Sequence, residues 1–447
     1  MSSLPLLRHH RPDSLIAWRD GRAVDTQTYL ADVAALAERL PEYEHVINLC
    51  EDRYRFLVGF AAALMREQTT LLPPSRAPGA IATVAAEWES TYCLVDTETD
   101  IGSIPVHRYQ EAATPLGSVE FPVLDAHQPA AILFTSGSTG KPMPHRKSWG
   151  TLVSGAHSTA QRLGIDNIHS GTLVGTVPHQ HMYGLEATIM LTLQAGLALF
   201  SGRPFYPADV AAALAQVPAP RIFVTTPLHL KACVAEGAPL PQVEFALSST
   251  APLPQSLAQA AEALLQAPVY EIYGCTEGGA IATRRTAQSV TWETIDDFRW
   301  ERDDQGLHLR GRELPDPVPL NDVMEFYTER KFVLLGRHAD LINIAGKRMS
   351  LADLNHKLHD IPGVVDGVFF MPEESEHHVT RLMAFVVAPG MTEHDILSHL
   401  AREIDPVFLP RPLVRVDSLL RNEAGKLPRE HLARLAARAM KPDAQLD

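Results

Sequence analysis

The stretch that decides the fold runs from Phe134 to Pro142 and reads Phe-Thr-Ser-Gly-Ser-Thr-Gly-Lys-Pro. It follows an apolar run that is typical of a buried strand. Its small residues let backbone N–H groups approach an anion closely. Further hydrogen-bond donors are the hydroxyls of Thr135, Ser136, Ser138 and Thr139. A Walker A loop would need glycine at position 135 and Ser or Thr after Lys141, which this sequence lacks. The stretch therefore predicts a phosphate-binding loop of another kind, with an ordinary surface loop as the alternative.

On both sides of this loop, β-type runs alternate with Ala-rich helical runs, a pattern typical of α/β layers. The strands are short, continuous apolar runs, which predicts burial on both faces. The expected strands are His45–Leu49, Ala130–Phe134, Leu173–Val177, Arg221–Thr225 and Val269–Tyr273. The expected helices are Tyr54–Met65, Trp149–Gly164, Ala208–Gln216 and Gln255–Gln266. The apolar stretch Ala187–Phe200 is too short to span a bilayer, and we interpret it as a buried helix.

The composition of the chain changes between Trp300 and Tyr327, where charged, Pro-containing, β-like segments replace the alternation. The region after Arg337 has the size of a small separate domain. Its expected elements are helices Ala352–His359 and Arg429–Met440 and a hairpin of Val364–Met371 with Leu382–Val387, connected through Pro372–Thr380. We predict a large multi-layer α/β N-terminal domain over residues 1–337, a hinge at 338–340 and a small mobile α+β C-terminal domain over 341–447.

Composition excludes several classes of protein. The 447 residues carry a net charge of -14, which argues against a general nucleic-acid binder. Cys50, Cys93, Cys233 and Cys275 are widely spaced, which predicts reduced thiols rather than a disulfide framework. No HExxH or Cys/His spacing predicts a zinc site. The N-terminus lacks the apolar core of a signal peptide, and we expect a soluble, cytoplasmic protein without a membrane span.

Five further motifs follow the glycine-rich loop along the chain. They are Pro178-His-Gln-His-Met-Tyr-Gly184, Ser248-Ser-Thr-Ala-Pro-Leu-Pro254, Tyr273-Gly-Cys-Thr-Glu277, Gly336-Arg-His-Ala-Asp-Leu-Ile-Asn-Ile-Ala-Gly-Lys-Arg348 and Asn422-Glu-Ala-Gly-Lys-Leu-Pro-Arg429. The chemistry of the third is suited to a nucleotide, because a planar ring fits a purine face and a carboxylate suits a hard cation.

Together and in this order, the motifs resemble the adenylate-forming superfamily: acyl-CoA synthetases, aryl-acid AMP-ligases, luciferases and peptide-synthetase adenylation domains. The resemblance implies ATP and Mg²⁺ as cofactors and the pantetheine thiol of CoA or an acyl carrier protein as acceptor. It implies nucleotide binding by Thr135, Ser136, Gly137, Ser138, Thr139, Gly140, Lys141, Tyr273, Gly274, Asp322 and Arg337. It implies catalytic roles for His181, Thr276, Glu277 (the Mg²⁺ ligand) and Lys426, an acyl pocket at Tyr183, Ser248, Thr250 and Gly278, and a pantetheine path at Gly346.

The sequence departs from the family pattern at several of these positions. Ser249 and Thr250 stand where the family has glycines, and Ala339 replaces the usual hinge aspartate. Met143 stands where the family has a lysine after the loop, so Lys141, Arg146 or Lys147 could supply that charge. Asp322 lacks its usual neighbours, and Glu325 competes with it for the ribose-binding role.

The identity of the acid is the least constrained part of the prediction. Polar and aromatic pocket candidates and a short N-terminal lobe favour a small aryl acid, such as 4-hydroxybenzoate. The compact outline is similar to ligases that load aryl starters in aryl-polyene pigment pathways. The alternatives are a medium-chain fatty acid, a luciferase-type oxygenase and a nucleotide-binding relative that has lost turnover.

Overall fold

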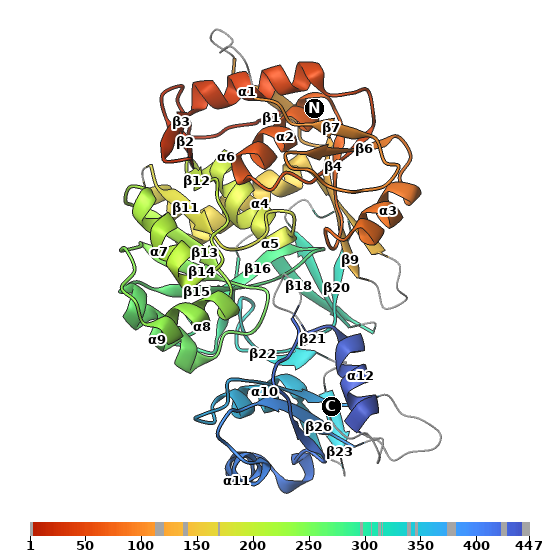
Figure 1. The fold of residues 1–447 in the computed structure, drawn as a ribbon, viewed down its shortest axis with the longest axis vertical. Coiled ribbons are helices and arrows are strands. Elements are labelled where there is room, and N and C mark those ends of the chain that lie inside the picture. The colour runs from red at the N-terminus through yellow and green to blue at the C-terminus, as the bar shows by residue number, and fades with distance from the viewer. Residues whose placement is uncertain are drawn as a thin grey trace.

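The computed structural model describes residues 3–111, 120–136, 142–168, 170–295, 298–304, 306–311, 314, 316–337, 341–344, 347–372, 381–421 and 427–439. Most of the described chain forms a large layered α/β region, and residues after 341 form a smaller region beside it (Figure 1). In this described part, no helix is both long and apolar enough to cross a bilayer.

Two large sheets carry the layers, and both are mainly parallel where the expected strands lie. Within the described residues the first sheet has the order β10 (Pro142–Ser148), β9 (Pro129–Ser136), β5 (Thr69–Leu72), β4 (His45–Asn48), β6 (Thr91–Val95), β7 (Val106–Arg108). The second sheet has the order β21 (Asp322–Phe326), β22 (Lys331–Arg337), β17 (Trp292–Thr294), β16 (Gly279–Arg284), β15 (Val269–Cys275), β14 (Phe245–Ser248), β13 (Arg221–Thr225), β11 (Thr172–Gly175), β12 (Ala198–Phe200), β2 (Leu15–Arg19), β3 (Arg22–Asp25). Smaller sheets join β18 (Phe298–Asp303), β19 (Gly306–Gly311) and β20 (Val318–Leu320), and pair β1 (Ser3–Pro5) with β8 (Val123–Asp125).

Helices cover both faces of both sheets, as the continuous apolar strands predict. The helices of this region are α1 (Thr26–Arg39), α2 (Arg53–Met65), α3 (Pro78–Glu87), α4 (Trp149–Leu163), α5 (Met182–Gly184), α6 (Leu191–Ala195), α7 (Pro207–Gln216), α8 (Pro227–Glu236) and α9 (Gln255–Leu265). Side chains of α2, α4 and α6 pack in the cluster that joins the two sheets. Alternate strand residues face outward, against α3 on the first sheet and against α7, α8 and α9 on the second.

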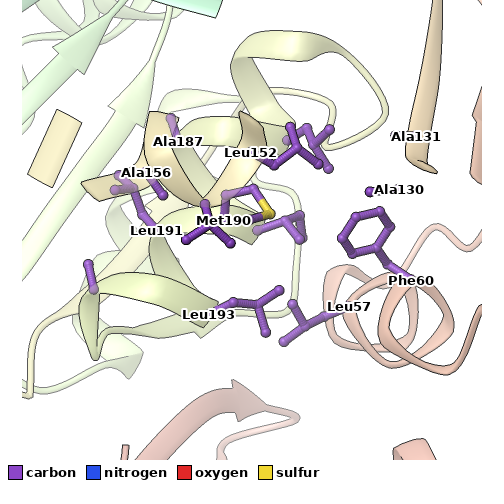
Figure 2. Close-up of a cluster of buried hydrophobic side chains, with 14 of the residues drawn as sticks. Leu57, Phe60, Ala130, Ala131, Leu152, Ala156, Ala187, Met190, Leu191 and Leu193 are labelled. Atoms are coloured by element: carbon purple, nitrogen blue, oxygen red, sulfur yellow. The ribbon is translucent and has the colours of Figure 1, made fainter. Parts of the chain in front are cut away.

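The core between the sheets brings together segments that are far apart in sequence. Figure 2 shows Leu57 and Phe60 of α2 facing Met190 and Leu193, while Ala130 and Ala131 of β9 lie on one side of the cluster. The full set labelled there is Leu57, Phe60, Ala130, Ala131, Leu152, Ala156, Ala187, Met190, Leu191 and Leu193. This packing fixes the two sheets relative to each other, and with them the loops at the strand ends.

The region after residue 341 has two hydrophobic clusters of its own. It contains β23 (Leu341–Ile344), β24 (Lys347–Ser350), α10 (Leu351–His359), β25 (Asp366–Phe370), β26 (Met383–Val387), α11 (Glu393–Glu403), β27 (Leu413–Arg415) and α12 (Arg429–Ala439). The predicted pairing of the two apolar runs is confirmed, since β25 and β26 are antiparallel. Lys231 of α8 donates a hydrogen bond to the Val365 carbonyl, which ties this region to the larger one. The predicted α/β layers with an added small α+β region are confirmed.

One element differs from the sequence prediction. The stretch Ala187–Phe200 is not a single helix: a π-helical segment (Leu185–Met190) leads into α6, and Ala198–Phe200 is strand β12. Gly196 ends the helix in the left-handed conformation, at φ 67°. Glycine adopts this conformation without a Cβ penalty, so it terminates α6 and turns the chain back into the sheet.

A buried arginine joins the elements that lead to the strand ends. Arg53 begins α2 and is 1% exposed. Its guanidinium donates to the carbonyls of Gly175 and Val177 at 3.1 and 2.8 Å, and to those of Phe200 and Gly202 at 3.3 and 3.0 Å. The planar fork therefore fixes the segment after β11, which continues into Pro178–Gly184.

We expect Arg53→Met to lower the free energy of unfolding by at least about 3 kcal/mol, because four buried carbonyls lose a charged donor. The exposed Arg22→Met is the matched control and should change it by less than about 0.5 kcal/mol. Chemical denaturation followed by far-UV circular dichroism measures both. Equal stability of the two variants would contradict the role of Arg53.

Candidate functional site: two hairpins at the strand ends

The Tyr273–Glu277 motif forms the first side of a β-hairpin. Strand β15 ends at Cys275 and pairs with Gly279 at the start of β16, so Thr276, Glu277 and Gly278 form the tip. A Cβ on Gly274 would lie 2.3 Å from the Gly279 carbonyl oxygen, and Gly279 has φ +74°. Glycine is therefore required at both positions, and the motif's Gly-x-Thr-Glu spacing makes a tight turn that presents Glu277.

A buried glutamate that sequence reasoning missed supports this hairpin. Glu186, 8% exposed, accepts a hydrogen bond from the backbone N–H of Ala280 at 2.9 Å. It belongs to the segment that follows Pro178–Gly184, so it connects two of the motifs. The signal for Glu186 in the sequence was its position beside an otherwise apolar stretch. A carboxylate buried there without a partner would be costly, so a partner was to be expected.

Strands β9 and β10 lie before and after the glycine-rich loop in sequence, and they pair as a second hairpin. Ser136 pairs with Pro142 and Thr135 with Met143. His145 on β10 lies diagonally from Thr135, and its Nε2 atom is 3.0 Å from the Thr135 hydroxyl and 3.6 Å from a carboxylate oxygen of Glu277. Burial lowers the pKa of His145 against the opposing effect of Glu277. The two hairpins thus meet, and His145 connects Thr135 with Glu277.

Asp322 belongs to a second group of predicted nucleotide-binding residues, together with Tyr273 and Arg337. The Tyr273 hydroxyl donates to its carboxylate at 2.6 Å. In the antiparallel β21–β22 ladder Asp322 pairs with Arg337, so these two predicted residues lie opposite each other. The Tyr273 ring also packs edge-on against Trp292 and Phe332. The competitor Glu325 is exposed and pairs with Val333. The structure brings Asp322, not Glu325, to Tyr273.

The Ser248–Pro254 turn follows β14 at the carboxyl end of the sheet. The Leu253 N–H donates to the buried carboxylate of Glu271 at 2.9 Å, and the Ser249 hydroxyl donates to the Ile272 carbonyl at 2.9 Å. Thr250 has φ +80°, a left-handed conformation that a β-branched residue rarely adopts. The turn thus keeps a glycine-type backbone conformation although its glycines are absent.

The Pro178–Gly184 segment contributes His181 and Tyr183. Gly184 is essential to its shape, because a Cβ there would lie 1.9 Å from the Pro178 carbonyl oxygen. His181 and Tyr183 are half-buried, and burial raises the pKa of the Tyr183 hydroxyl. The more deeply buried histidine is His179, whose Nε2 atom is 2.9 Å from the Cys50 carbonyl oxygen.

Several predicted residues lie outside the described residues. These are Gly137, Ser138, Thr139, Gly140 and Lys141 of the loop, the hinge 338–340, Gly346 and Lys426. The backbones of Ser136 and Arg337 are described. All four cysteines are described and are free thiols.

The donor set at Glu277 suits a magnesium ion carried with phosphates. The Glu277 side chain is 40% exposed, and hard cations prefer carboxylate oxygens. Among the described residues, no group of three or more His, Cys, Asp or Glu side chains is placed to hold a metal ion. One carboxylate is nevertheless the usual protein share of a Mg²⁺ ion whose other ligands are phosphate and water.

Comparison with known proteins identifies the family. The protein family described as AMP-binding enzyme matches this chain over residues 30–313. The chain belongs to this family. It is therefore an enzyme of the class that the motifs predict, and the resemblance to adenylate-forming proteins is confirmed at the level of the family.

Individual relatives are similar over much of the chain. A 4-coumarate–CoA ligase of Rhodobacter capsulatus is 31% identical over 270 residues, which are 60% of this chain and 66%, just under two thirds, of that enzyme. A 4-coumarate–CoA ligase of Halorhodospira halophila is 27% identical over 336 residues, 71% of this chain and 80% of that enzyme. The o-succinylbenzoate–CoA synthetase of Bacillus subtilis, solved with ATP and a magnesium ion, is 18% identical with a TM-score of 0.79, covering 96% of this chain and 99% of that one. This last likeness shows the fold.

Asp322 and Glu325 of this AMP-binding enzyme offer a matched test. Asp322→Asn should raise the KM for ATP about 10- to 100-fold, since we expect the Asp322 carboxylate to accept ribose hydroxyls, which is worth roughly 1.5–3 kcal/mol. Glu325→Gln, an equal change on the same strand, should leave KM within about twofold. Initial rates of acid-dependent pyrophosphate release measure both, and a larger effect at Glu325 would reverse the assignment.

Proposed function

We propose that the protein activates a carboxylic acid with ATP and Mg²⁺ to an acyl adenylate. It then transfers the acyl group to the pantetheine thiol of CoA or an acyl carrier protein. The observation that carries this proposal is the meeting of the β9–β10 and β15–β16 hairpins, where His145 contacts both Thr135 and Glu277. The family and the relatives named as CoA ligases support it.

In the first half-reaction a carboxylate oxygen of the acid attacks the α-phosphorus of ATP. The bond from that phosphorus to the bridging oxygen breaks, and its electron pair leaves with pyrophosphate. Both reactants are anions, so the site must align them and offset their repulsion. We assign the loop from Thr135 to Lys141 to the departing pyrophosphate, Asp322 and Arg337 to the nucleotide, and Lys426 to the incoming carboxylate.

We assign Glu277, with Thr276 beside it, to the magnesium ion. The metal, when bound, supplies positive charge to the phosphate oxygens. Tyr273 orients Asp322 through the 2.6 Å hydrogen bond, and its ring stands at the assigned nucleotide side of the hairpin. His181 lies in the Pro178–Gly184 segment beside the assigned acyl pocket.

In the second half-reaction the thiol loses its proton to solvent and its sulfur attacks the acyl carbon. The bond from that carbon to the phosphate oxygen breaks, and AMP leaves with the electron pair. We assign Gly346 to the pantetheine path and residues 338–340 to a hinge between domains 1–337 and 341–447. Rotation there would replace Lys426 with the Gly346 segment at the adenylate, because hinges are the few residues that absorb the backbone change.

Lys426→Ala separates the two half-reactions. We expect it to reduce acid-dependent ATP–pyrophosphate exchange at least about 100-fold, the usual cost of one charge-stabilising group. Thioester formation from a supplied acyl adenylate should stay within about threefold. Exchange is followed with labelled pyrophosphate and thioester by mass spectrometry. Equal loss of both half-reactions would contradict the role of Lys426.

For the acid itself we propose a small aryl acid with a polar ring substituent, such as 4-hydroxybenzoate. Ser248 is fully buried, and its hydroxyl has no hydrogen-bond partner among the described residues; the same is true of the Thr250 hydroxyl. Unpaired buried hydroxyls at a site are explained by a ligand group that pairs with them. An alkyl chain would leave them unpaired, which disfavours a medium-chain fatty acid. The 4-coumarate ligases among the relatives support an aryl acid.

An acid panel scored by pyrophosphate release, with and without CoA, tests this proposal. We expect kcat/KM for 4-hydroxybenzoate or 4-coumarate to exceed that for benzoate and octanoate at least tenfold, about 1.4 kcal/mol of discrimination. Preference for octanoate would favour the fatty-acid alternative, and no exchange with any acid would favour a non-catalytic relative.

Ser248→Ala should lower kcat/KM for the hydroxylated acid towards that of benzoate and leave benzoate unchanged. Thr172→Val is the matched control, because the Thr172 hydroxyl is also buried and unpaired but lies at the opposite end of its strand. If both variants shift the preference equally, Ser248 does not contact the ring substituent.

A further inference from the structure

The sequence lacks one cation that related enzymes carry after the glycine-rich loop, and Met143 occupies its position. Strand β10 shows where a replacement can come from, because side chains alternate between the two faces of a strand. Met143, His145 and Lys147 share one face, and Pro144 and Arg146 share the other. Met143 is 55% exposed and lies opposite Thr135.

Arg146 is committed to the outer face of the first sheet. Its guanidinium lies 4.9 Å from the centre of the Trp88 ring, which itself packs edge-on against Phe134. This cation–π contact holds the charge away from Glu277, on the opposite side of β10. Of the three cations that the sequence leaves open, Arg146 thus has its guanidinium on Trp88, and Lys141 lies outside the described residues.

Lys147 points to the inner face and reaches the site. It is 3% exposed, and its ammonium donates a hydrogen bond to the backbone carbonyl of Glu277. The bond uses the main chain of Glu277 and brings a positive charge to the hairpin tip. His145, two residues earlier, lies between Thr135 and that carboxylate.

The cluster opens onto a cavity of about 180 Å³. It is lined by His145, Arg146, Lys147, Thr151, Glu277, Leu314 and the segment from Asp316 to Pro319. A buried ammonium is costly unless a charge or a hydrogen bond compensates it. An anion in this cavity would lie beside the Lys147 ammonium.

We propose that Lys147 is a further catalytic residue, whose ammonium contacts the β- and γ-phosphates of ATP and the pyrophosphate that leaves. It takes the part of the lysine that is absent at position 143. As the bond between the α-phosphorus and the bridging oxygen breaks, the electron pair passes to that oxygen, and Lys147 offsets the added charge. This inference rests on the proposed function, because it concerns the leaving group of that reaction.

Ligands that differ in their phosphates separate this role from a structural one. The probes are ATP, inorganic pyrophosphate, and an acyl-sulfamoyl adenosine, which mimics the acyl adenylate and has no β- or γ-phosphate. Lys147→Met should weaken ATP and pyrophosphate binding at least tenfold and leave the sulfamoyl compound within threefold. Isothermal titration of the full chain measures all three without turnover, and circular dichroism checks the fold.

Two further variants complete the test. Arg146→Met removes a neighbouring cation on the other face and should leave all three affinities within twofold. Met143→Lys added to Lys147→Met restores a lysine at the family position and should recover most of the lost affinity for pyrophosphate. Failure of this double variant to recover any affinity would contradict the substitution of one lysine for the other.

The remaining outcomes overturn the inference. Equal weakening of all three ligands would mean that Lys147 only holds the Glu277 hairpin, and unchanged pyrophosphate affinity would place the charge elsewhere. The proposed function fails separately: in that case the wild-type enzyme would show no acid-dependent exchange, whatever Lys147→Met does to pyrophosphate binding.

Discussion

The site depends on one constraint: strand β10 of the first sheet must be held against the tip of the β15–β16 hairpin of the second. The β9–β10 hairpin belongs to the first sheet and the β15–β16 hairpin to the second. The hydrogen bond from Lys147 to the Glu277 carbonyl joins them, and His145 completes the contact. The core between the sheets fixes the distance between the two hairpins, because close-packed helices leave the sheets little freedom to shift (Figure 2). A pair of unconnected loops could not hold charges in the fixed geometry that electrostatic catalysis requires.

The sequence predicts most of this arrangement, and physical reasons explain the rest. Strand and helix positions follow from apolar periodicity, and β13 matches its predicted bounds, Arg221–Thr225. The turn at Gly196 was missed because an apolar run of helix followed by strand has no change in hydropathy to mark it. Motif spacing indicates which residues act together. It does not reveal cross-strand register, which pairs Asp322 with Arg337, nor which of Arg146 and Lys147 faces the site.

Glycines in the motifs differ in how strictly the backbone requires them. At Gly184 and Gly274 a Cβ would lie 1.9 and 2.3 Å from a carbonyl oxygen, so the local path leaves no alternative residue. At Thr250 the left-handed backbone persists without glycine, at φ +80°. Such a conformation costs on the order of 1–3 kcal/mol and persists only where the surroundings enforce it. Here the anchors of Leu253 on Glu271 and of Ser249 on Ile272 flank the strained residue, which keeps its hydroxyl buried at the strand end.

Two buried cations show how the same fold uses positive charge in different ways. Arg53 donates to four carbonyls, and burial lowers its pKa to about 10, so it stays protonated at neutral pH. Its fork matches several fixed acceptors, which suits a structural cross-link. Lys147 instead presents a compact ammonium on a long aliphatic stem, beside a cavity and hydrogen-bonded to the backbone carbonyl of Glu277. Besides joining the hairpins, a point charge of this kind can follow a phosphate group as the bond to it breaks. The choice of lysine at position 147 therefore suits both the contact between the hairpins and the proposed contact with a phosphate.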